Sequence, residues 1–319
     1  MILNDNELLP SERAVYALRT LYLSFGYRRY KVSKFEEYDL YAENKSFLSD
    51  KSILTFTDTD GRLMALKPDI TLSIIKNTKD SSGMQKVFYN ECVYRAGGSG
   101  FKEIMQTGLE CIGDIDKNST AEVISLAYES LKRLSGSFLL DVSHMGFITG
   151  LINEITVDGA QRIKLMHAVS AKSAYAVRDV CEQIGAGAGY ADALAEACLL
   201  YGTPGDVLSR ARLLVKNHEM ESSLDTLENI SRDMAEGGLS ENLRIDFSVL
   251  NDTNYYNGII FKGFIDGIAQ SVLSGGRYDS LLSRLGRKQG AVGFAVYLDG
   301  LDRLYADMVS EDVGGGSID

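Results

Sequence analysis

Short strand-like segments fall into two groups in this chain, one before residue 143 and one after residue 243. They are rich in β-branched and aromatic residues, and several follow each other without a helix between them. The segments are residues 63–66, 86–94, 104–113, 137–142, 244–249, 255–263, 268–274 and 291–298. Because parallel strands need long crossover connections, strands in such close succession predict a mostly antiparallel sheet.

Two amphipathic segments precede and interrupt the first group of strands. Residues 11–25 carry apolar side chains at spacings of three and four and end at Gly26. Residues 119–135 begin with Ser119-Thr-Ala-Glu122, the pattern of a capping box, and are followed by Gly136. These helices, together with the strands, predict an α+β fold in which helices flank an antiparallel sheet.

The middle of the chain has a different character. Apolar residues in the segment 151–240 follow helical spacing, and glycines divide the segment into short pieces. We therefore expect residues 1–150 and 241–308 to form one discontinuous domain, with 151–240 as a small all-helical insertion. The glycine-rich end, 309–319, is expected to be a flexible tail.

Charge and composition exclude several functional classes. The chain has 33 Lys and Arg against 44 Asp and Glu, a net charge of −11, which disfavours a surface that follows nucleic-acid phosphates. The four cysteines form no CxxC pair and the three histidines have no ligand spacing, so we expect no metal site and no disulfide framework. Without an apolar run of membrane-spanning length or a signal peptide, a cytoplasmic location is expected.

Polar residues are concentrated on one face of the predicted strand 104–112. The alternation of a strand places Ile104, Gln106, Gly108, Glu110 and Ile112 on that face. The glycine is expected to leave room above the sheet, while the amide and the carboxylate suit a small ligand that carries N–H groups. The alternative is a face that is simply solvated.

A second polar and aromatic group lies near the end of the chain. The segment 254–261 contains Tyr255 and Tyr256, which are expected to point to opposite faces of a strand, with Tyr256 beside Gly258. A Gly-Gly turn followed by Arg-Tyr-Asp at 277–279 is expected to close over a ligand. The alternative is a hairpin with aromatic cross-strand packing.

Taken together, these segments and three others resemble the catalytic domain of histidyl-tRNA synthetases, which are class II aminoacyl-tRNA synthetases. The resemblance runs from about residue 8 to residue 305, with the motifs in the family's order. The motifs are Leu66-Lys-Pro-Asp-Ile-Thr71, Val93-Tyr-Arg95, Gln106-Thr-Gly-Leu-Glu110, Tyr255-Tyr256-Asn-Gly with Gly275-Gly-Arg-Tyr278-Asp, and Gly293-Phe-Ala-Val296. The resemblance implies the class II synthetase fold and a homodimer that pairs through residues near 28–47.

Departures from the family pattern affect the ATP side of the site. Asp299 and Gly300 stand where motif 3 continues to an acidic residue and the arginine that grips ATP, and Asn251 replaces a second arginine. Gly97 replaces a motif 2 glutamate, and Ser33 replaces the motif 1 proline. Because the sequence ends soon after motif 3, we expect no anticodon-binding domain.

The loss of two arginines affects the adenylation reaction, in which negative charge gathers on the triphosphate of ATP. Hydrogen bonds to charged groups contribute about 1.5–3 kcal/mol each. Two missing arginines therefore remove ~3–6 kcal/mol of transition-state stabilisation, or roughly 10²–10⁴ in rate. We expect no aminoacylation, no catalytic residue and no cofactor.

The retained motifs belong to the histidine side of the synthetase site. The resemblance implies a histidine-binding set, namely Asp69, Thr71, Arg95, Gln106, Glu110, Tyr255, Tyr256 and Tyr278. Thr71 and a carboxylate are expected to hold the ammonium of histidine, with Glu110 and Tyr256 on the imidazole nitrogens and Arg95 on the carboxylate. The alternative is that Gln106 and Glu110 satisfy each other and bind no ligand.

A synthetase core without ATP machinery is similar to the regulatory subunits of ATP phosphoribosyltransferase. That family works with a short-form catalytic subunit in the first step of histidine biosynthesis and confers feedback inhibition by histidine. The resemblance implies a homodimer within a hetero-octamer that binds free histidine and no tRNA or membrane. Two alternatives remain at this point: a truncated synthetase-like enzyme that activates histidine or another amino acid, and a binding module with a vestigial pocket.

Overall fold

A large sheet forms the centre of the protein in the computed structural model, which describes residues 8–44, 48, 53–78, 83–97, 100–155, 158–250 and 255–304. Within these ranges the sheet has nine strands. In spatial order they are β1 (Arg28–Arg29), β5 (Gln85–Gly97), β6 (Gly100–Gly113), β12 (Gly290–Tyr297), β11 (Leu273–Arg277), β10 (Ile259–Ile265), β7 (Phe138–His144), β9 (Leu243–Asp246) and β8 (Tyr201–Gly202).

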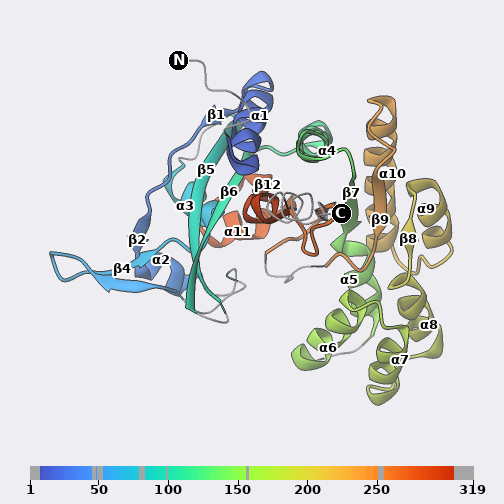
Figure 1. The fold of residues 1–319 in the computed structure, drawn as a ribbon. Helices are drawn as coiled ribbons and strands as arrows, with labels where there is room; N and C mark the ends of the chain where they lie inside the picture. Colours follow the sequence, from blue (N-terminus) through green and yellow to red (C-terminus); the bar gives the residue numbers. More distant parts are fainter. Residues whose placement is uncertain are drawn as a thin grey trace, which may run out of the picture.

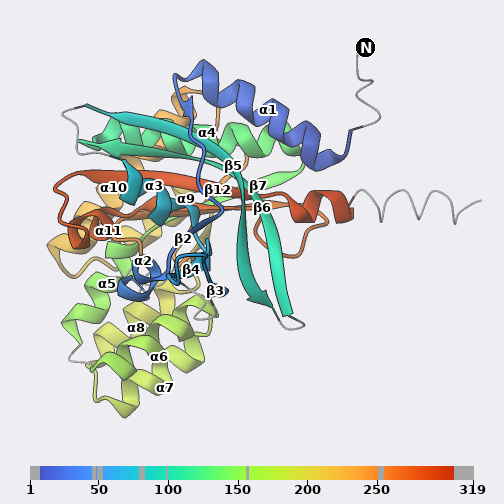
Figure 2. The same cartoon turned by 90° about the vertical axis from the view of Figure 1, so that its left-hand side faces the viewer.

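Antiparallel pairing dominates this sheet, as the sequence predicted. Only β1 with β5 and β7 with β9 are parallel among the described ladders. The β5–β6 hairpin is the longest pair and extends past the body of the protein (Figures 1 and 2). Glu110 on β6 lies opposite Gly293 on β12, and this register later determines the geometry of the site.

Two helices cover one face of the sheet, α1 (Pro10–Ser24) and α4 (Lys117–Leu134), which lie together in Figure 2. Tyr22 of α1 is fully buried, with its ring centroid 6.0 Å from the rings of both Phe88 and Phe294. Its hydroxyl lies 3.1 Å from the Ser130 hydroxyl of α4, so the phenol is satisfied inside the core. Because these helices fill this face, a ligand site must lie on the other one.

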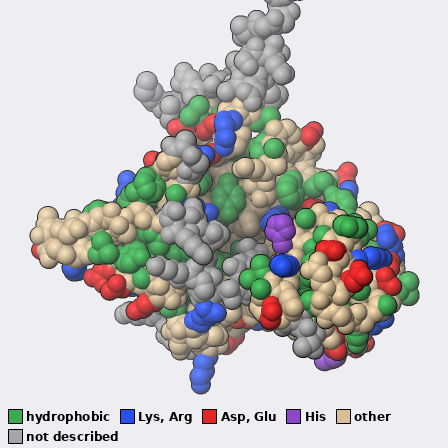
Figure 3. Space-filling view, turned by 90° about the horizontal axis from the view of Figure 1, so that it is seen from below, with side chains coloured by type: hydrophobic (Ala, Val, Ile, Leu, Met, Phe, Trp, Pro, Cys, Tyr) green, Lys and Arg blue, Asp and Glu red, His purple; other side chains and the backbone are tan. Residues whose placement is uncertain are grey.

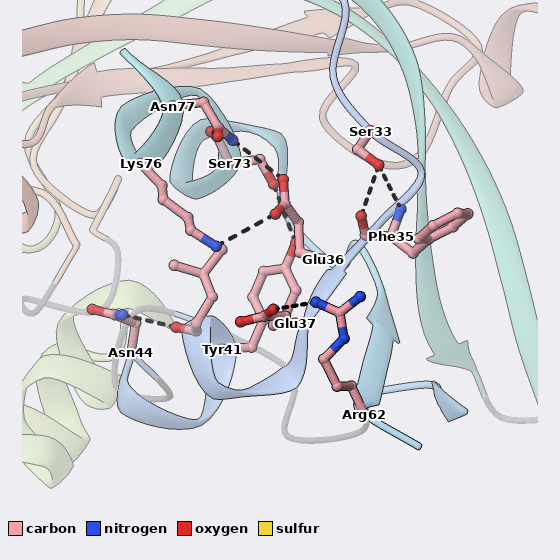
Figure 4. Close-up of polar contacts among 11 residues, drawn as sticks. Ser33, Phe35, Glu36, Glu37, Tyr41, Asn44, Arg62, Ser73, Lys76 and Asn77 are labelled. Carbon is pink, nitrogen blue, oxygen red and sulfur yellow. Dashed lines mark hydrogen bonds and ion pairs between the residues drawn. The ribbon is translucent and has the colours of Figure 1, made fainter. Parts of the chain in front are cut away.

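The opposite face meets α3 (Ile70–Asn77), α11 (Asp279–Arg284) and a small three-stranded sheet. That small sheet contains β2 (Phe35–Glu37), β4 (Leu63–Leu66) and β3 (Thr55–Thr57), with α2 (Tyr38–Glu43) following β2. Figure 4 shows the polar contacts that join it to α3: Glu36 accepts from Asn77 at 3.2 Å and pairs with Lys76 at 3.5 Å. These contacts hold α3 against the small sheet.

The segment predicted to be helical contains α6 (Gly159–Ser170), α7 (Ala174–Gln183), α8 (Ala188–Ala197), α9 (Pro204–Arg212) and α10 (His218–Glu236), preceded by α5 (Met145–Glu154). These helices gather on one side of the molecule (Figure 1). The segment is not purely helical, because β8 leaves it to pair with β9 of the large sheet. Division of the chain into domains at 151 and 240 stays a prediction.

Local structure differs from the sequence-based expectation at the start of α4 and at the strand expected over residues 268–274. Helix α4 begins two residues early: its N-cap is Asp116, which accepts from the Ser119 N–H at 2.7 Å, so the capping box at Ser119 was wrong. The expected strand 268–274 is instead β11, displaced toward the C-terminus. The predicted flexible tail, 309–319, lies outside the described residues. Within the described ranges, no helix combines the length and apolarity needed to cross a bilayer.

The predicted Gly-Gly turn is also wrong, because Gly275 and Gly276 lie inside β11 and pair with both neighbouring strands. A side chain at Gly275 would meet Phe294 and Phe261 within 2.6 Å. One at Gly276 would meet the ring of Tyr256 at 2.7 Å. These glycines therefore permit close packing above and below the strand rather than a chain reversal.

Candidate functional site

A cavity of about 250 Å³ opens on the sheet face that α1 and α4 leave uncovered. It lies between the N-terminus of α3, the strands β6, β11 and β12, and the segment 255–256. All eight residues predicted from the sequence line it, namely Asp69, Thr71, Arg95, Gln106, Glu110, Tyr255, Tyr256 and Tyr278. Five separate stretches of the chain therefore converge on one site. We refer to it as the first cavity.

Glu110 is the buried centre of the first cavity, with 1% of its surface exposed. One carboxylate oxygen accepts from the Thr71 hydroxyl at 2.7 Å, and the other accepts from the Tyr278 hydroxyl. Burial raises the pKa of Glu110 to about 8, against the lowering effect of these two hydrogen bonds. Space for the carboxylate depends on Gly293, where a Cβ atom would lie 1.8 Å from Oε2 of Glu110.

Gln106 provides an unused donor two residues before Gly108 on the same strand face. The residue is 3% exposed, and its Nε2 has no hydrogen-bond partner among the described residues. A buried amide without a partner costs about 1–3 kcal/mol, so a ligand acceptor in the cavity would recover that energy. The alternative in which Gln106 and Glu110 satisfy each other is therefore wrong.

The start of α3 supplies a second carboxylate and a cation. Asp69 is the N-cap, and it accepts from the Leu72 N–H at 2.8 Å. Burial raises the pKa of Asp69, while the helix amide and the nearby Arg95 lower it. Arg95 donates from Nε to the Pro68 carbonyl at 2.9 Å, which leaves the rest of its guanidinium for a carboxylate.

Three tyrosines form the remaining wall. The rings of Tyr255 and Tyr256 lie edge to face at 4.7 Å, and Tyr255 lies 5.9 Å from Tyr278. Burial raises the pKa of all three phenols well above the ordinary value, so each stays a neutral hydroxyl. The expectation that Tyr255 and Tyr256 point to opposite faces was wrong, because β10 begins only at Ile259 and strand alternation does not apply to them.

Sequence reasoning missed several lining residues, including Tyr89, Lys262, Ser274 and Tyr297. Tyr89 lies opposite Gly108 in the β5–β6 hairpin, and its hydroxyl lies 2.6 Å from where a Gly108 Cβ would be. Room above Gly108 is therefore filled by a tyrosine rather than left open. Tyr89 and Tyr297 could have been found only from the cross-strand register. The sequence does not define that register unless the strand pairing is known.

The described positions that depart from the synthetase pattern lie in different parts of the fold. Asp299 accepts from the Met105 N–H at 3.3 Å, which ties the end of β12 to β6. Gly300 follows it in a helical turn and has Ile268 as its near neighbour. Ser33 accepts from and donates to the backbone of Phe35 in a local turn (Figure 4). Gly97 ends β5, and Asn251 lies outside the described residues.

Comparison with known proteins agrees with this fold. A family model described as "Histidyl-tRNA synthetase" matches residues 3–301. The protein therefore belongs to the class II synthetase-like proteins of that family.

Two curated relatives identify the family of this chain within the class II synthetase-like proteins. A protein of Oceanobacillus iheyensis is 28% identical over 299 residues, 92% of this chain and 74% of that protein. One of Thermoanaerobacter pseudethanolicus is 32% identical over 289 residues, 88% of this chain and 75% of that protein. Both are named ATP phosphoribosyltransferase regulatory subunit. The chain belongs to this family of regulatory subunits.

Solved structures support the fold. A structure from Bacillus halodurans, titled as an ATP phosphoribosyltransferase regulatory subunit/histidyl-tRNA synthetase, superimposes with a TM-score of 0.83 at 23% identity and covers 92% of this chain and 79% of its own. The ATP phosphoribosyl transferase (HisG:HisZ) complex from Thermotoga maritima gives 0.72 at 18% identity, with 94% and 99% covered. At these identities the likeness concerns the fold alone.

Proposed function

We propose that this regulatory subunit binds free histidine in the first cavity and, together with a separate short-form catalytic subunit, serves the first step of histidine biosynthesis. In that step ATP is joined to phosphoribosyl pyrophosphate by the catalytic subunit, and histidine inhibits the reaction. The observation that carries the proposal is the polar lining of the cavity, where Gln106 Nε2 is buried without a partner among the described residues and the buried carboxyl group of Glu110 lines the same space.

Each part of histidine has a complementary group in the cavity. The Glu110 carboxyl group accepts one hydroxyl on each oxygen, and its carbonyl oxygen keeps a second lone pair even when the group is protonated, so an imidazole N–H has an acceptor there. The Tyr256 phenol serves the other imidazole nitrogen, while Asp69 and the Thr71 oxygen receive the ammonium. Arg95 and the Gln106 amide then face the carboxylate of the ligand.

Calorimetry with histidine tests this assignment. Glu110→Ala removes the acceptor of the imidazole N–H and is expected to weaken binding by ~1–3 kcal/mol, roughly 5- to 150-fold. Glu103→Ala is the matched control, because Glu103 is an exposed glutamate on the same strand and does not line the cavity. If Glu110→Ala and the wild-type protein bind histidine with equal affinity when the catalytic partner is present, histidine does not bind in the first cavity and feedback inhibition acts through another site.

We also propose that the protein does not adenylate histidine. Positions 299 and 300 hold an aspartate and a glycine, and the aspartate is engaged with the backbone of β6. Neither residue supplies the positive charge that a triphosphate needs in the transition state. Pyrophosphate exchange with ATP and histidine is the assay. Exchange at a rate typical of synthetases would favour the truncated-enzyme alternative.

Assembly is the third part of the proposal. Class II cores pair through motif 1, so residues near 28–47 are expected at a twofold interface. In support, Phe35 and Phe56 of the small sheet form an exposed aromatic pair, 48% and 38% exposed, with ring centroids 5.7 Å apart. Light scattering on the isolated protein should give about twice 35.0 kDa, and a monomer at micromolar concentration contradicts the pairing.

Co-purification tests the larger assembly. A short-form catalytic subunit produced with this chain in the cytoplasm should co-elute with it at the mass of a hetero-octamer. Elution of the two proteins as separate species would contradict the partnership, while leaving histidine binding open to its own test.

A further inference from the structure

A second cavity of about 380 Å³ lies on the same sheet face, farther along β10 and β7. Asp141, Lys172, Tyr201, Asp246 and Lys262 line it. It shares only Lys262 with the first cavity. None of the synthetase-like motifs contributes a residue to this cavity, so its lining needs a separate explanation. Seen from below, the surface of the molecule is hollowed beside the helical segment (Figure 3).

Asp141 is an unpartnered carboxylate in the wall of the second cavity. Its side chain belongs to a residue that is 6% exposed, and Oδ1 has no hydrogen-bond partner among the described residues. Ser143 lies two residues on along the same face, and its hydroxyl is also buried without a partner in that part of the chain. A buried carboxylate oxygen without a donor is costly, and a donor supplied by a ligand would remove that cost.

The basic residues beside Asp141 do not neutralise it. Lys262 is its direct cross-strand neighbour on β10, yet within the described ranges no ion pair joins the two side chains, and Asp141 Oδ1 is left without a partner. Arg244 is its neighbour on β9, but the Arg244 guanidinium donates to the Glu241 and Leu243 carbonyls at 2.8 Å. Asp141 and Lys262 are thus adjacent opposite charges that are held apart.

The other charged pair at this cavity is already closed. Lys172 bridges to Asp246 at 2.8 Å and lies 4.4 Å from the centroid of the Tyr201 ring. Asp246 also accepts from the Ser248 hydroxyl at 2.6 Å. Of the described residues that line this cavity, one carboxylate and one ammonium therefore remain unpaired, Asp141 and Lys262, on neighbouring strands.

From this arrangement we propose that the second cavity binds a free α-amino acid as a zwitterion, with its ammonium on Asp141 and its carboxylate on Lys262. Leu139 and Phe264 pair across β7 and β10, two residues along the same face, and supply an apolar wall for the side chain of the ligand. A divalent metal ion fits less well, because the other carboxylate in the described lining, Asp246, is already bound to a lysine. The site shares Lys262 with the first cavity but uses none of the eight residues proposed to bind histidine, so the two proposals can fail separately.

A screen of individual amino acids tests the proposal. The twenty common amino acids are each added at millimolar concentration to the full chain carrying Glu110→Ala, which weakens the proposed histidine site in the first cavity, and binding is read by saturation-transfer NMR. At least one should bind, and Asp141→Asn should weaken that binding about tenfold or more. Asp114→Asn is the matched control, because Asp114 is exposed and outside both cavities.

A second variant guards against misfolding of Asp141→Asn. Ser170 is exposed at the end of α6 and lines the cavity, so Ser170→Phe obstructs the site without disturbing a buried residue. It should abolish the same signal. Methylammonium chloride, which has no carboxylate, should bind at least tenfold more weakly than the amino acid.

Three outcomes overturn the proposal. The first is that no amino acid binds to the Glu110→Ala protein. The second is binding that survives both Asp141→Asn and Ser170→Phe, which places the ligand elsewhere. The third is methylammonium binding as tight as that of the amino acid, which removes Lys262 from the interaction and reduces the site to one for simple amines.

Discussion

The buried carboxylate of Glu110 predicts a pH dependence of stability that one substitution removes. The pKa of Glu110 is about 8 in the folded protein and about 4.5 in the unfolded chain. Below pH 4.5 both states are protonated, so burial of the group carries no ionisation cost. Between pH 4.5 and 8 the unfolded state ionises and the folded state does not, so this part of the stability is progressively lost as pH rises.

The size of the effect follows from the difference between the two pKa values. Each pH unit in that window lowers the free energy of unfolding by about 1.4 kcal/mol, so the loss reaches at most about 5 kcal/mol above pH 8. Glu110→Gln cannot ionise and lacks this slope. Its amide meets hydroxyl donors from Thr71 and Tyr278, which adds a pH-independent cost of about 1–3 kcal/mol.

Urea denaturation of both proteins at pH 5, 6.5 and 8 is the assay. The difference in unfolding free energy, wild type minus Glu110→Gln, should fall by about 4 kcal/mol from pH 5 to pH 8. Other groups, such as Asp141 with its pKa raised to about 6 by burial, titrate in both proteins and cancel. A difference that changes by less than about 1 kcal/mol refutes the reasoning, because Glu110 would then titrate as a solvated carboxylate.

Three further substitutions test the packing of buried groups. Gly293→Ala should abolish histidine binding and destabilise the fold by more than about 2 kcal/mol, because its Cβ would overlap the buried carboxyl group of Glu110. The control Gly136→Ala has open space around it and should change neither binding, measured by calorimetry, nor stability, measured by thermal unfolding. Lys67→Ala should lower the free energy of unfolding in urea by about 3 kcal/mol, because the fully buried Lys67 ammonium pairs with the Glu91 carboxylate at 3.2 Å. The double variant Lys67→Ala/Glu91→Ala should recover part of that loss. Arg287→Ala should cost about 2–4 kcal/mol in the same assay, because its guanidinium caps the carbonyl end of α3, and unchanged stability would contradict that role.

The geometry also shows how the centre of the first cavity is held. Glu110 is fixed by the register of β6 with β12 and by hydrogen bonds from Thr71 and Tyr278, and positions 299 and 300 take no part in these contacts. Asp299 instead fastens the end of β12 to β6 through the Met105 N–H. The part of the cavity around Glu110, where we propose that histidine binds, is therefore a self-supporting part of the fold.

The sequence alone was sufficient to locate several of the elements and eight of the residues that line the first cavity. Apolar spacing of three and four located α1 and α4, and dense β-branched and aromatic runs located β5, β6, β7 and β12 to within a few residues. Resemblance in short motifs grouped eight residues from distant parts of the chain, and all eight line the first cavity. Motifs of this kind are readable because each keeps its residues within a few positions of one another along the chain.

Only the tertiary structure determines which side chains from distant segments meet. Tyr89 and Lys262 reach the cavity through cross-strand pairing, and Gly275-Gly276 is a strand interior because rings pack on both of its faces. The unpaired Asp141 could not be predicted, since its neighbours Lys262 and Arg244 are far away in sequence and only their side-chain directions leave it without a partner among the described residues. Local propensity acts over a few residues, whereas burial, register and the partners of a buried charge are set by segments that meet only when the sheet closes.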